Sequence, residues 1–263
     1  MHPEMEDPVE EIDGDPASDA LFLCDHASNA LPQAYGTLGL PPADLNRHIA
    51  FDIGAAWVTR HLASYFSAPA ILSRFSRLLI DPNRGADDPT LVMRLSDRVI
   101  VPGNARIGKS EIEHRLVHYW RPYRAAISRK IGVMLAHGVP PAIVSVHSFT
   151  PCWKSKPRPW EIGILWDNDP RLAKPLIEAL AGAGFCVGDN EPYDGALAGD
   201  TLDEQVTCLG LAGVLLELRQ DLVQTEPKAE ALAEHVAEII APILERPELH
   251  RKAFFESRIH RYL

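Results

Sequence analysis

The sequence predicts an α/β fold, a three-layer sandwich in which helices flank a mixed, mostly parallel central sheet. Short apolar runs, several of them rich in β-branched residues, alternate along the chain with longer stretches whose apolar residues recur at helical spacing. Such alternation is typical of strands connected by crossover helices. Several of the apolar runs also stop abruptly in polar side chains, and this edge of an open α/β sheet is where ligands bind.

The length and composition indicate one globular domain preceded by an acidic segment. The chain has 263 residues, and 46% of them are hydrophobic, which is enough for a sizeable core. Residues 1–19 contain eight acids and no lysine or arginine, and they account for most of the net charge of -10. We therefore expect a disordered or loosely held acidic arm over 1–19, a single domain over 20–246 and a basic tail over 247–263. Without a basic face, nucleic acid is not an expected partner.

Three further features bear on the cellular location. The acidic start lacks the basic and apolar regions of a signal peptide. No apolar run approaches the roughly 20 residues of a membrane helix. The four cysteines lie far apart and form no CxxC pair, as expected of reduced thiols. We therefore expect a cytoplasmic protein that acts on a small molecule and has no membrane partner.

The first half of the chain is expected to hold strands around one long helix. Ala20–Cys24 is an apolar run that ends in a polar turn, so it is predicted as a buried strand. After two prolines, apolar residues spaced by four or five predict a helix from about residue 44 to residue 66, with Asp52 inside it. Ala70–Phe75 and Leu78–Ile80 are predicted as a pair of strands or as one long strand.

The second half of the chain is expected to alternate between helices and strands. The capping-box pattern Ser110-Glu111-Ile112-Glu113 predicts a helix from about residue 110 to residue 136, which Pro122 kinks or restarts. The other predicted elements are, in order, the strand Ala142–Val146, the strand Ile162–Trp166, the helix Pro170–Ala181, the strand Phe185–Val187, the helix Thr201–Leu209, the strand Val214–Leu216 and the helix Pro227–Leu244.

Four predicted strands lead into polar side chains that are suited to chemistry. These are Asp25-His26, Asp81 with Asn83 and Arg84, His147-Ser148, and Glu217 with Arg219. If the strands are parallel neighbours, their carboxyl ends meet at one edge of the sheet. Two histidines and a carboxylate are a ligand set for catalytic zinc, and a further carboxylate can take a proton from the attacking water. Arginines can bind a substrate carboxylate through paired hydrogen bonds.

Ordinary structural roles stay open for the same residues. His26 and His147 can be unrelated histidines at the edge of the core. Glu217 can form an ion pair with Arg219, because residues two apart on a strand share a face. Asn83 and Arg84 can belong to an ordinary turn.

Five short segments of the chain carry a family resemblance. They are, in order, Asp25-His-Ala-Ser-Asn29, Phe51-Asp52-Ile-Gly54, Ser76-Arg77 through Asp81-Pro-Asn-Arg84, His147-Ser148, and Glu217-Leu-Arg219-Gln-Asp-Leu222. Together they resemble the N-formylglutamate amidohydrolase family from about residue 20 to residue 245, and their order and spacing are fairly specific. That family is similar to zinc carboxypeptidases and aspartoacylase-type hydrolases in its α/β sandwich and its Asn-Arg pair. The resemblance therefore implies a phosphorylase/hydrolase-like, zinc carboxypeptidase-like fold.

The resemblance also implies an activity and a set of site residues. The activity is a zinc-dependent hydrolysis that removes an acyl group, such as formyl, from the nitrogen of an acidic amino acid. His26 and His147 would bind the metal, and Glu217 would be the general base. The remaining implied roles are polarisation of the scissile carbonyl by Arg77, binding of a substrate carboxylate by Asn83 and Arg84, neutralisation of a second acidic group by Arg219, and further substrate contacts from Ser148 and Asn29.

One position departs from the pattern of related enzymes. Relatives with a HxxE first motif supply a glutamate ligand three residues after the first histidine, and here that position is Asn29. Asp52 is therefore the expected third metal ligand, provided that its helix packs over the strand end. Two other functions stay open: a zinc peptidase or cell-wall amidase with a wider cleft, and a non-catalytic carboxylate-binding protein.

Overall fold

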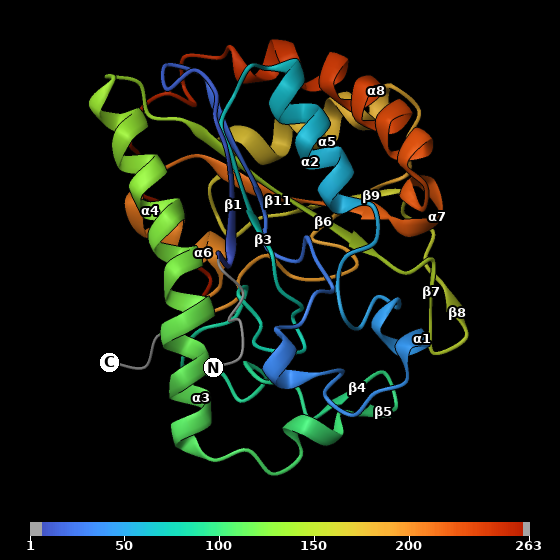
Figure 1. Ribbon diagram of the computed structural model, residues 1–263. Coiled ribbons are helices and arrows are strands. Elements are labelled where there is room, and N and C mark those ends of the chain that lie inside the picture. Colours follow the sequence, from blue (N-terminus) through green and yellow to red (C-terminus); the bar gives the residue numbers. More distant parts are fainter. Residues whose placement is uncertain (1–6, 260–263) are drawn as a thin grey trace.

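The computed structural model describes residues 7–259, and a seven-stranded sheet runs through the molecule (Figure 1). Its strand order is β1-β3-β2-β6-β11-β9-β10. The strands are β1 (Val9–Ile12), β2 (Ala20–Cys24), β3 (Ala70–Ser73), β6 (Ala142–Phe149), β9 (Ile162–Leu165), β10 (Val187–Asp189) and β11 (Gly213–Arg219). β3, β2, β6 and β11 are parallel neighbours, and β10 is parallel to β9. β1 and β9 run antiparallel to their neighbours β3 and β11, so the predicted mixed, mostly parallel sheet is confirmed.

Helices cover both faces of this sheet and complete the three layers (Figure 1). One face carries α2 (Ala55–Tyr65), α5 (Pro170–Gly182) and α8 (Glu226–Leu244), and the other carries α4 (Arg121–Ala136). Successive residues of a strand point to opposite faces, so each strand feeds both cores. In β2, Phe22 and Cys24 belong to the first core, and Leu21 and Leu23 belong to the second.

Smaller elements connect the main helices and strands. Their bounds are α1 (Pro42–Leu45), α3 (Lys109–Arg115), α6 (Thr201–Gln205), α7 (Gln220–Val223), the hairpin of β4 (Leu95–Ser96) and β5 (Val99–Ile100), the hairpin of β7 (Cys152–Trp153) and β8 (Lys156–Pro157), the 3-10 turns Gln33–Tyr35, Pro102–Asn104 and Thr207–Leu209, and the π-helical turn Leu116–Trp120 that joins α3 to α4. Within the described part of the chain, no helix is both long and apolar enough to cross a bilayer.

The prediction of one long helix from residue 44 to residue 66 is wrong, because the chain forms α1 and α2 with an irregular connection between them. Gly54 precedes α2 with a φ of 85°, a left-handed conformation that interrupts a helix and that glycine adopts readily. A Cβ atom on Gly54 would lie 2.2 Å from the carbonyl oxygen of Val223, so the close packing here also requires glycine. Asp52 therefore lies in the connection, where its N–H donates to the His26 carbonyl.

Two smaller predictions also differ from the structure. Leu78–Ile80 is buried but does not form the predicted strand, since the Leu79 N–H closes a turn onto the Ser76 carbonyl. The capping box predicted at Ser110 is wrong, because α3 already begins at Lys109 and no side chain caps it.

The acidic N-terminal segment is not loose throughout. Val9–Ile12 forms β1 and pairs with β3 at the edge of the sheet. An ion pair of 2.7 Å between Glu10 and Arg60 ties the strand to α2. The expectation of a loosely held arm is therefore wrong for these four residues, whereas residues 1–6 lie outside the described residues.

The basic C-terminal segment, which the sequence alone did not place, lies against the domain. The Ala253 N–H donates to the Gly210 carbonyl, and Arg258 forms an ion pair with Asp194. Residues 260–263 lie outside the described residues. The division of the chain at residues 19/20 and 246/247 stays a prediction.

Candidate metal centre and active site

A cavity of about 420 Å³ lies at the carboxyl edge of the parallel strands. Its lining includes eight residues that the sequence singled out: His26, Asp52, Arg77, Asn83, Arg84, His147, Ser148 and Glu217. The parallel register of β6 and β11 places His147 directly opposite Glu217. The structure therefore brings residues that are up to about 190 positions apart in the sequence to one cavity, as parallel packing predicts.

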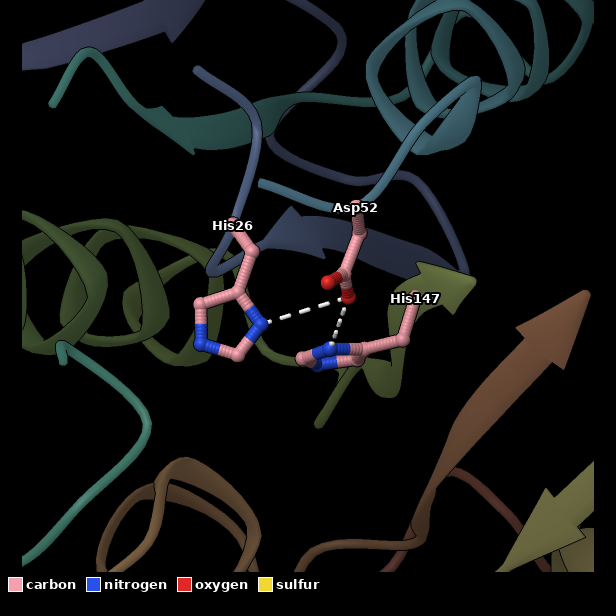
Figure 2. Close-up of side chains that lie close together, drawn as sticks. All are labelled: His26, Asp52 and His147. Carbon is pink, nitrogen blue, oxygen red and sulfur yellow. Dashed lines mark hydrogen bonds and ion pairs between the residues drawn. The ribbon is translucent and has the colours of Figure 1, made fainter. Parts of the chain in front are cut away.

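His26, Asp52 and His147 form a buried cluster in this cavity (Figure 2). Nδ1 of His26 lies 3.2 Å from Oδ2 of Asp52, and Nδ1 of His147 lies 3.0 Å from the same oxygen. The three side chains come from the turn after β2, the connection before α2 and β6 itself. One ligand atom from each residue lies within 4.8 Å of the other two, so the cluster can offer two imidazole nitrogens and a carboxylate oxygen to one cation.

A second carboxylate holds each histidine of the cluster by its other ring nitrogen. Nε2 of His26 lies 2.8 Å from Oδ1 of Asp81, and Nε2 of His147 lies 3.0 Å from Oδ2 of Asp25. An imidazole that donates from Nε2 keeps a lone pair on Nδ1, which is the form that a metal ligand needs. Histidines that bind metals are commonly oriented by such carboxylates. Both Nδ1 atoms are thereby directed toward Asp52.

The spacing of the three ligand atoms suits a tetrahedral cation such as zinc. Zinc binds nitrogen and oxygen at roughly 2.0–2.2 Å, which places neighbouring tetrahedral ligands about 3.3–3.6 Å apart. The two separations of 3.2 and 3.0 Å are slightly shorter, as expected for atoms that hydrogen-bond to one another. Two histidines and one carboxylate also leave a fourth position open, as in catalytic zinc sites. The residues of the cluster therefore fit the predicted metal.

The hydrogen bonds of the cluster shift its pKa values in opposite directions. Burial alone would raise the pKa of Asp25, but hydrogen bonds from His147 and Thr201 lower it to about 2. Burial would lower the pKa of His147, but its hydrogen bonds to Asp25 and Asp52 raise that pKa well above the ordinary value. These hydrogen bonds therefore favour a protonated cluster in the absence of metal, and a bound cation would displace the proton.

Glu217 is a buried carboxylate beside the cluster whose Oε2 has no hydrogen-bond partner among the residues that the structure describes. β11 places it next to Gly163 of β9, where an added Cβ atom would lie 3.2 Å from the Glu217 Cβ. Burial raises the pKa of Glu217 to about 7, against the opposing charge of His147. A carboxylate with a near-neutral pKa is suited to accept a proton and return it.

Two arginines line the cavity beside the cluster, and they differ in their partners. Arg77 forms an ion pair of 2.8 Å with Asp81 and a longer one of 3.4 Å with Asp52. Arg84 is half-buried and donates from Nη1 to the Asn83 carbonyl, and it has no ion pair within the described chain. Arg84 therefore lines the cavity as a cation without an ion pair to these carboxylates, although its charge helps to lower the pKa of Asp81.

Two predicted substrate-binding residues lie outside the cavity, and other groups satisfy their polar atoms. Arg219 pairs with Asp221 at 2.8 Å, and its Nη1 donates to two main-chain carbonyls. Asn29 donates from Nδ2 to the Leu45 carbonyl. The alternative ion pair between Glu217 and Arg219 is not formed either, since Arg219 turns toward Asp221.

Tyr193 and Asp200 are polar residues at the site that had not been singled out from the sequence, whereas Asp25 and Asp81 had been named at the strand ends without a role of their own. Asp25 and Asp81 stand inside the quoted motifs, but their contacts with histidine nitrogens depend on side-chain geometry. Tyr193 and Asp200 line the cavity from the segment between β10 and α6. Burial raises the pKa of Asp200 to about 7. The signal that could have found this segment is its length, because long loops in compact domains are often functional.

Similarity to known proteins decides the family of this chain. The family model described as N-formylglutamate amidohydrolase matches residues 18–224. The chain belongs to the N-formylglutamate amidohydrolase family. The family match includes the His-Asp-His cluster, Glu217 and both cavity arginines, so the resemblance predicted from the five motifs is confirmed.

Two solved structures of other proteins have a fold similar to that of this chain. The gene product Atu2144 from Agrobacterium tumefaciens is 35% identical and has a TM-score of 0.87, with 92% of this chain and 96% of that chain covered. The N-formylglutamate amidohydrolase from Ralstonia eutropha JMP134 is 18% identical and has a TM-score of 0.70, with 90% and 97% covered. A search of curated proteins gave no significant match.

Proposed function

We propose that this protein is a metal-dependent amidohydrolase that cleaves the N-acyl, in particular N-formyl, amide of an acidic amino acid such as N-formylglutamate. The observation that carries the proposal is the buried Glu217 carboxylate beside a histidine–aspartate–histidine cluster, since its Oε2 has no hydrogen-bond partner among the described residues. Membership of an amidohydrolase family supports hydrolysis of an amide. Two guanidinium groups in the cavity wall support a negatively charged substrate.

The cluster would hold the metal, and zinc suits its ligand set. His26, Asp52 and His147 would be the ligands, while Asp81 and Asp25 orient the two histidines from behind. A divalent cation bound there supplies Lewis acidity and lowers the pKa of a water ligand to about 7. The second carboxylates keep the imidazole rings from rotating and raise their basicity toward the metal.

Glu217 would carry the proton in the reaction. Its carboxylate accepts a proton as water attacks the carbonyl carbon of the amide, so that a new C–O bond forms. It then returns the proton to the nitrogen as the C–N bond breaks, which releases the free amino acid and the acyl group as a carboxylic acid. A pKa of about 7 allows both transfers near neutral pH.

The other cavity residues would bind and polarise the substrate. Asn83 and Arg84 hold a substrate carboxylate, and Arg84 suits this role because it forms no ion pair within the described chain. Arg77 polarises the scissile carbonyl, and its ion pair with Asp81 holds the guanidinium in place before the substrate arrives. Ser148 forms part of the wall, and its hydroxyl is fixed by donation to the Ile53 carbonyl.

Metal analysis combined with a hydrolysis assay tests the proposal. The purified protein should hold a stoichiometric metal and hydrolyse N-formylglutamate, with activity lost on chelation and restored by zinc. Glu217→Gln should keep the metal and lose about 100- to 10,000-fold in kcat. Glu230→Gln, which changes an exposed glutamate of α8, is the matched control and should retain full activity.

A substrate panel separates this activity from a peptidase or amidase with a wider cleft. Formyl-, acetyl- and peptidyl-glutamates are compared, and the formyl compound should be the preferred substrate. Hydrolysis that needs no metal, or full turnover by Glu217→Gln, would overturn the mechanism. Turnover in neither protein would indicate a binding protein instead of an enzyme.

A further inference from the structure

The hairpin of β7 and β8 carries unneutralised positive charge beside the cavity. Trp153 of this hairpin lines the cavity, and Lys154, Lys156 and Arg158 follow it in the sequence. None of these three cations forms an ion pair with any residue that the structure describes, although the chain as a whole has a net charge of -10. A local positive charge at the entrance to a cavity favours anionic ligands.

Arg158 is the cation of this hairpin that the structure holds in place. Its guanidinium carbon lies 5.0 Å from the ring centroid of Tyr193. It also lies 5.7 Å from the centroids of Phe149 and Trp153. Its Nη1 donates to the main-chain and side-chain oxygens of Thr150, both at 3.3 Å. All four contact residues line the cavity, so the half-buried Arg158, which is not itself a lining residue, lies beside its rim.

The contacts of Arg158 leave it suited to bind a carboxylate. Aromatic rings contact the face of a guanidinium, whereas its N–H donors point outward in the plane. A guanidinium fixed in this way loses little side-chain freedom when it binds a carboxylate through two parallel hydrogen bonds. No described carboxylate occupies that place.

Tyr193 connects the rim to the reacting groups. Partial burial and the charge of Glu217 raise the pKa of the Tyr193 hydroxyl, and the charge of Arg158 opposes them. The Tyr193 side chain therefore interacts electrostatically with both the proposed base and the guanidinium at the rim.

Arg219, which the sequence assigned to a second acidic group, instead supports the segment that carries Arg158. Its Nη1 donates to the carbonyl oxygens of Pro159 and Trp160 at 3.2 and 3.3 Å. These residues follow Arg158 directly. Arg158, on the segment that Arg219 holds in place, is therefore a candidate for the role that was predicted for Arg219.

We propose that Arg158 binds the side-chain carboxylate of the substrate and selects acidic over neutral N-acyl amino acids. The inference rests on the proposed function and deepens it, because Arg84 then holds the other carboxylate inside the cavity. Lys154 and Lys156 add to the positive field that attracts the substrate and make no specific contact with it.

The test compares an acidic substrate with its neutral isostere. Wild-type protein should prefer N-formylglutamate over N-formylglutamine. Arg158→Gln should lose about 10- to 100-fold in kcat/KM for N-formylglutamate, mainly through KM, as expected for loss of hydrogen bonds between charged groups. Its kcat/KM for N-formylglutamine should change less than about twofold. Arg158→Lys should recover part of the preference, because it restores the charge without the planar fork.

Arg106→Gln is the matched control, because it removes an exposed arginine that has no ring contact, hydrogen bond or ion pair with a described residue lining the cavity. It should leave both substrates unaffected. An unchanged preference in Arg158→Gln overturns the inference, and equal losses on both substrates also overturn it, because they indicate a purely structural role.

A wild-type protein that hydrolyses neither substrate would overturn the proposed function, and a binding measurement then decides the inference about Arg158. Calorimetry compares L-glutamate with L-glutamine on wild type and on Arg158→Gln. Tighter binding of glutamate that the variant loses supports the inference. Equal binding of the two ligands to wild type, or an unchanged preference in the variant, overturns it.

Discussion

At the scale of single residues, the chemistry of the site depends on which polar atoms have partners. Each ring nitrogen of His26 and His147 faces a carboxylate oxygen. Oε2 of Glu217 faces no described partner in the same cavity. An unpartnered buried carboxylate is disfavoured in its charged form, so its pKa rises toward neutrality. The carboxylate without a partner is therefore the one that can exchange a proton with a substrate.

We expect kcat/KM for N-formylglutamate to fall as the pH decreases, because Glu217 must be ionised to accept a proton. Its pKa of about 7 applies to the protein without a cation, and a bound positive charge lowers that value. The acidic limb of the pH–rate profile should therefore lie at or below about pH 7. A profile in which activity increases toward acid pH would contradict the assignment of Glu217 as base.

Asp25→Asn should weaken metal binding by about 10- to 100-fold, because Nε2 of His147 loses its charged acceptor. Competition with a chromogenic chelator measures the affinity without reference to activity. Asp13→Asn removes a fully exposed carboxylate and serves as the control. Equal affinities in Asp25→Asn and wild type would show that Asp25 does not orient His147.

The sequence predicted residues whose position follows from the end of an apolar run, and it failed where side-chain direction decides. His26, His147 and Glu217 end or follow buried strands, and this is visible in the sequence. The sequence could not show that Arg219 is unsuited to binding an acidic group of the substrate, because only the structure shows that it meets a carboxylate two residues away. Such local pairing leaves no trace in composition or spacing.

At the scale of elements, the connection between α1 and α2 places Asp52 in the cluster. Its apolar spacing is compatible with one long helix, and a single glycine inside such a pattern does not rule the helix out. In the structure, the Ser76 hydroxyl and the Arg77 N–H both donate to the Ala50 carbonyl and hold the connection against the sheet. These contacts join distant segments, so local pattern could not reveal them.

Gly54→Ala should destabilise the protein by about 2 kcal/mol or more, because alanine is strained at a φ of 85° and its Cβ would meet the Val223 carbonyl oxygen. Metal affinity should fall as well, since Asp52 lies two residues before the glycine. Thermal unfolding and a zinc titration measure the two effects.

Gly132→Ala is the matched control for this substitution. Gly132 lies in α4 with no atom within 4 Å of an added Cβ, so alanine should stabilise the helix by about 0.5–1 kcal/mol. If Gly54→Ala unfolds at the wild-type temperature and binds zinc equally well, the connection tolerates a side chain and does not fix Asp52.

At the scale of the whole molecule, the strand order explains where the cavity lies. From β2 the chain passes first to β3 on one side and later to β6 on the other side. Such a reversal leaves a crevice at the carboxyl ends of the two strands between which it occurs. His26 follows β2 and His147 lies near the end of β6, so the two histidines stand on either side of this crevice. Alternation of strands and helices predicted the α/β class, but strand order depends on pairings between distant segments.

The buried charges together determine how the stability of the metal-free protein depends on pH. Burial raises the pKa values of Glu217 and Asp200 to about 7, so the folded state binds more protons than the unfolded state between about pH 4 and pH 7. Stability therefore falls as the pH rises through this range. The raised pKa of His147 acts in the same direction. Asp25 has a pKa lowered to about 2, so its contribution is lost as the pH falls below about 4.

We therefore expect the Tm of the chelated protein to be highest between about pH 4 and pH 6, with a loss of several kcal/mol of stability by pH 8. Asp200→Asn should reduce this loss, because asparagine still accepts the hydrogen bond from the Asp203 N–H at the start of α6 but cannot ionise. Thermal unfolding of both proteins in chelator at several pH values measures the difference. A variant whose Tm declines with pH as steeply as that of wild type would show that Asp200 does not contribute. Zinc should flatten both profiles, because a cation in the cluster offsets the charge that the carboxyl groups acquire.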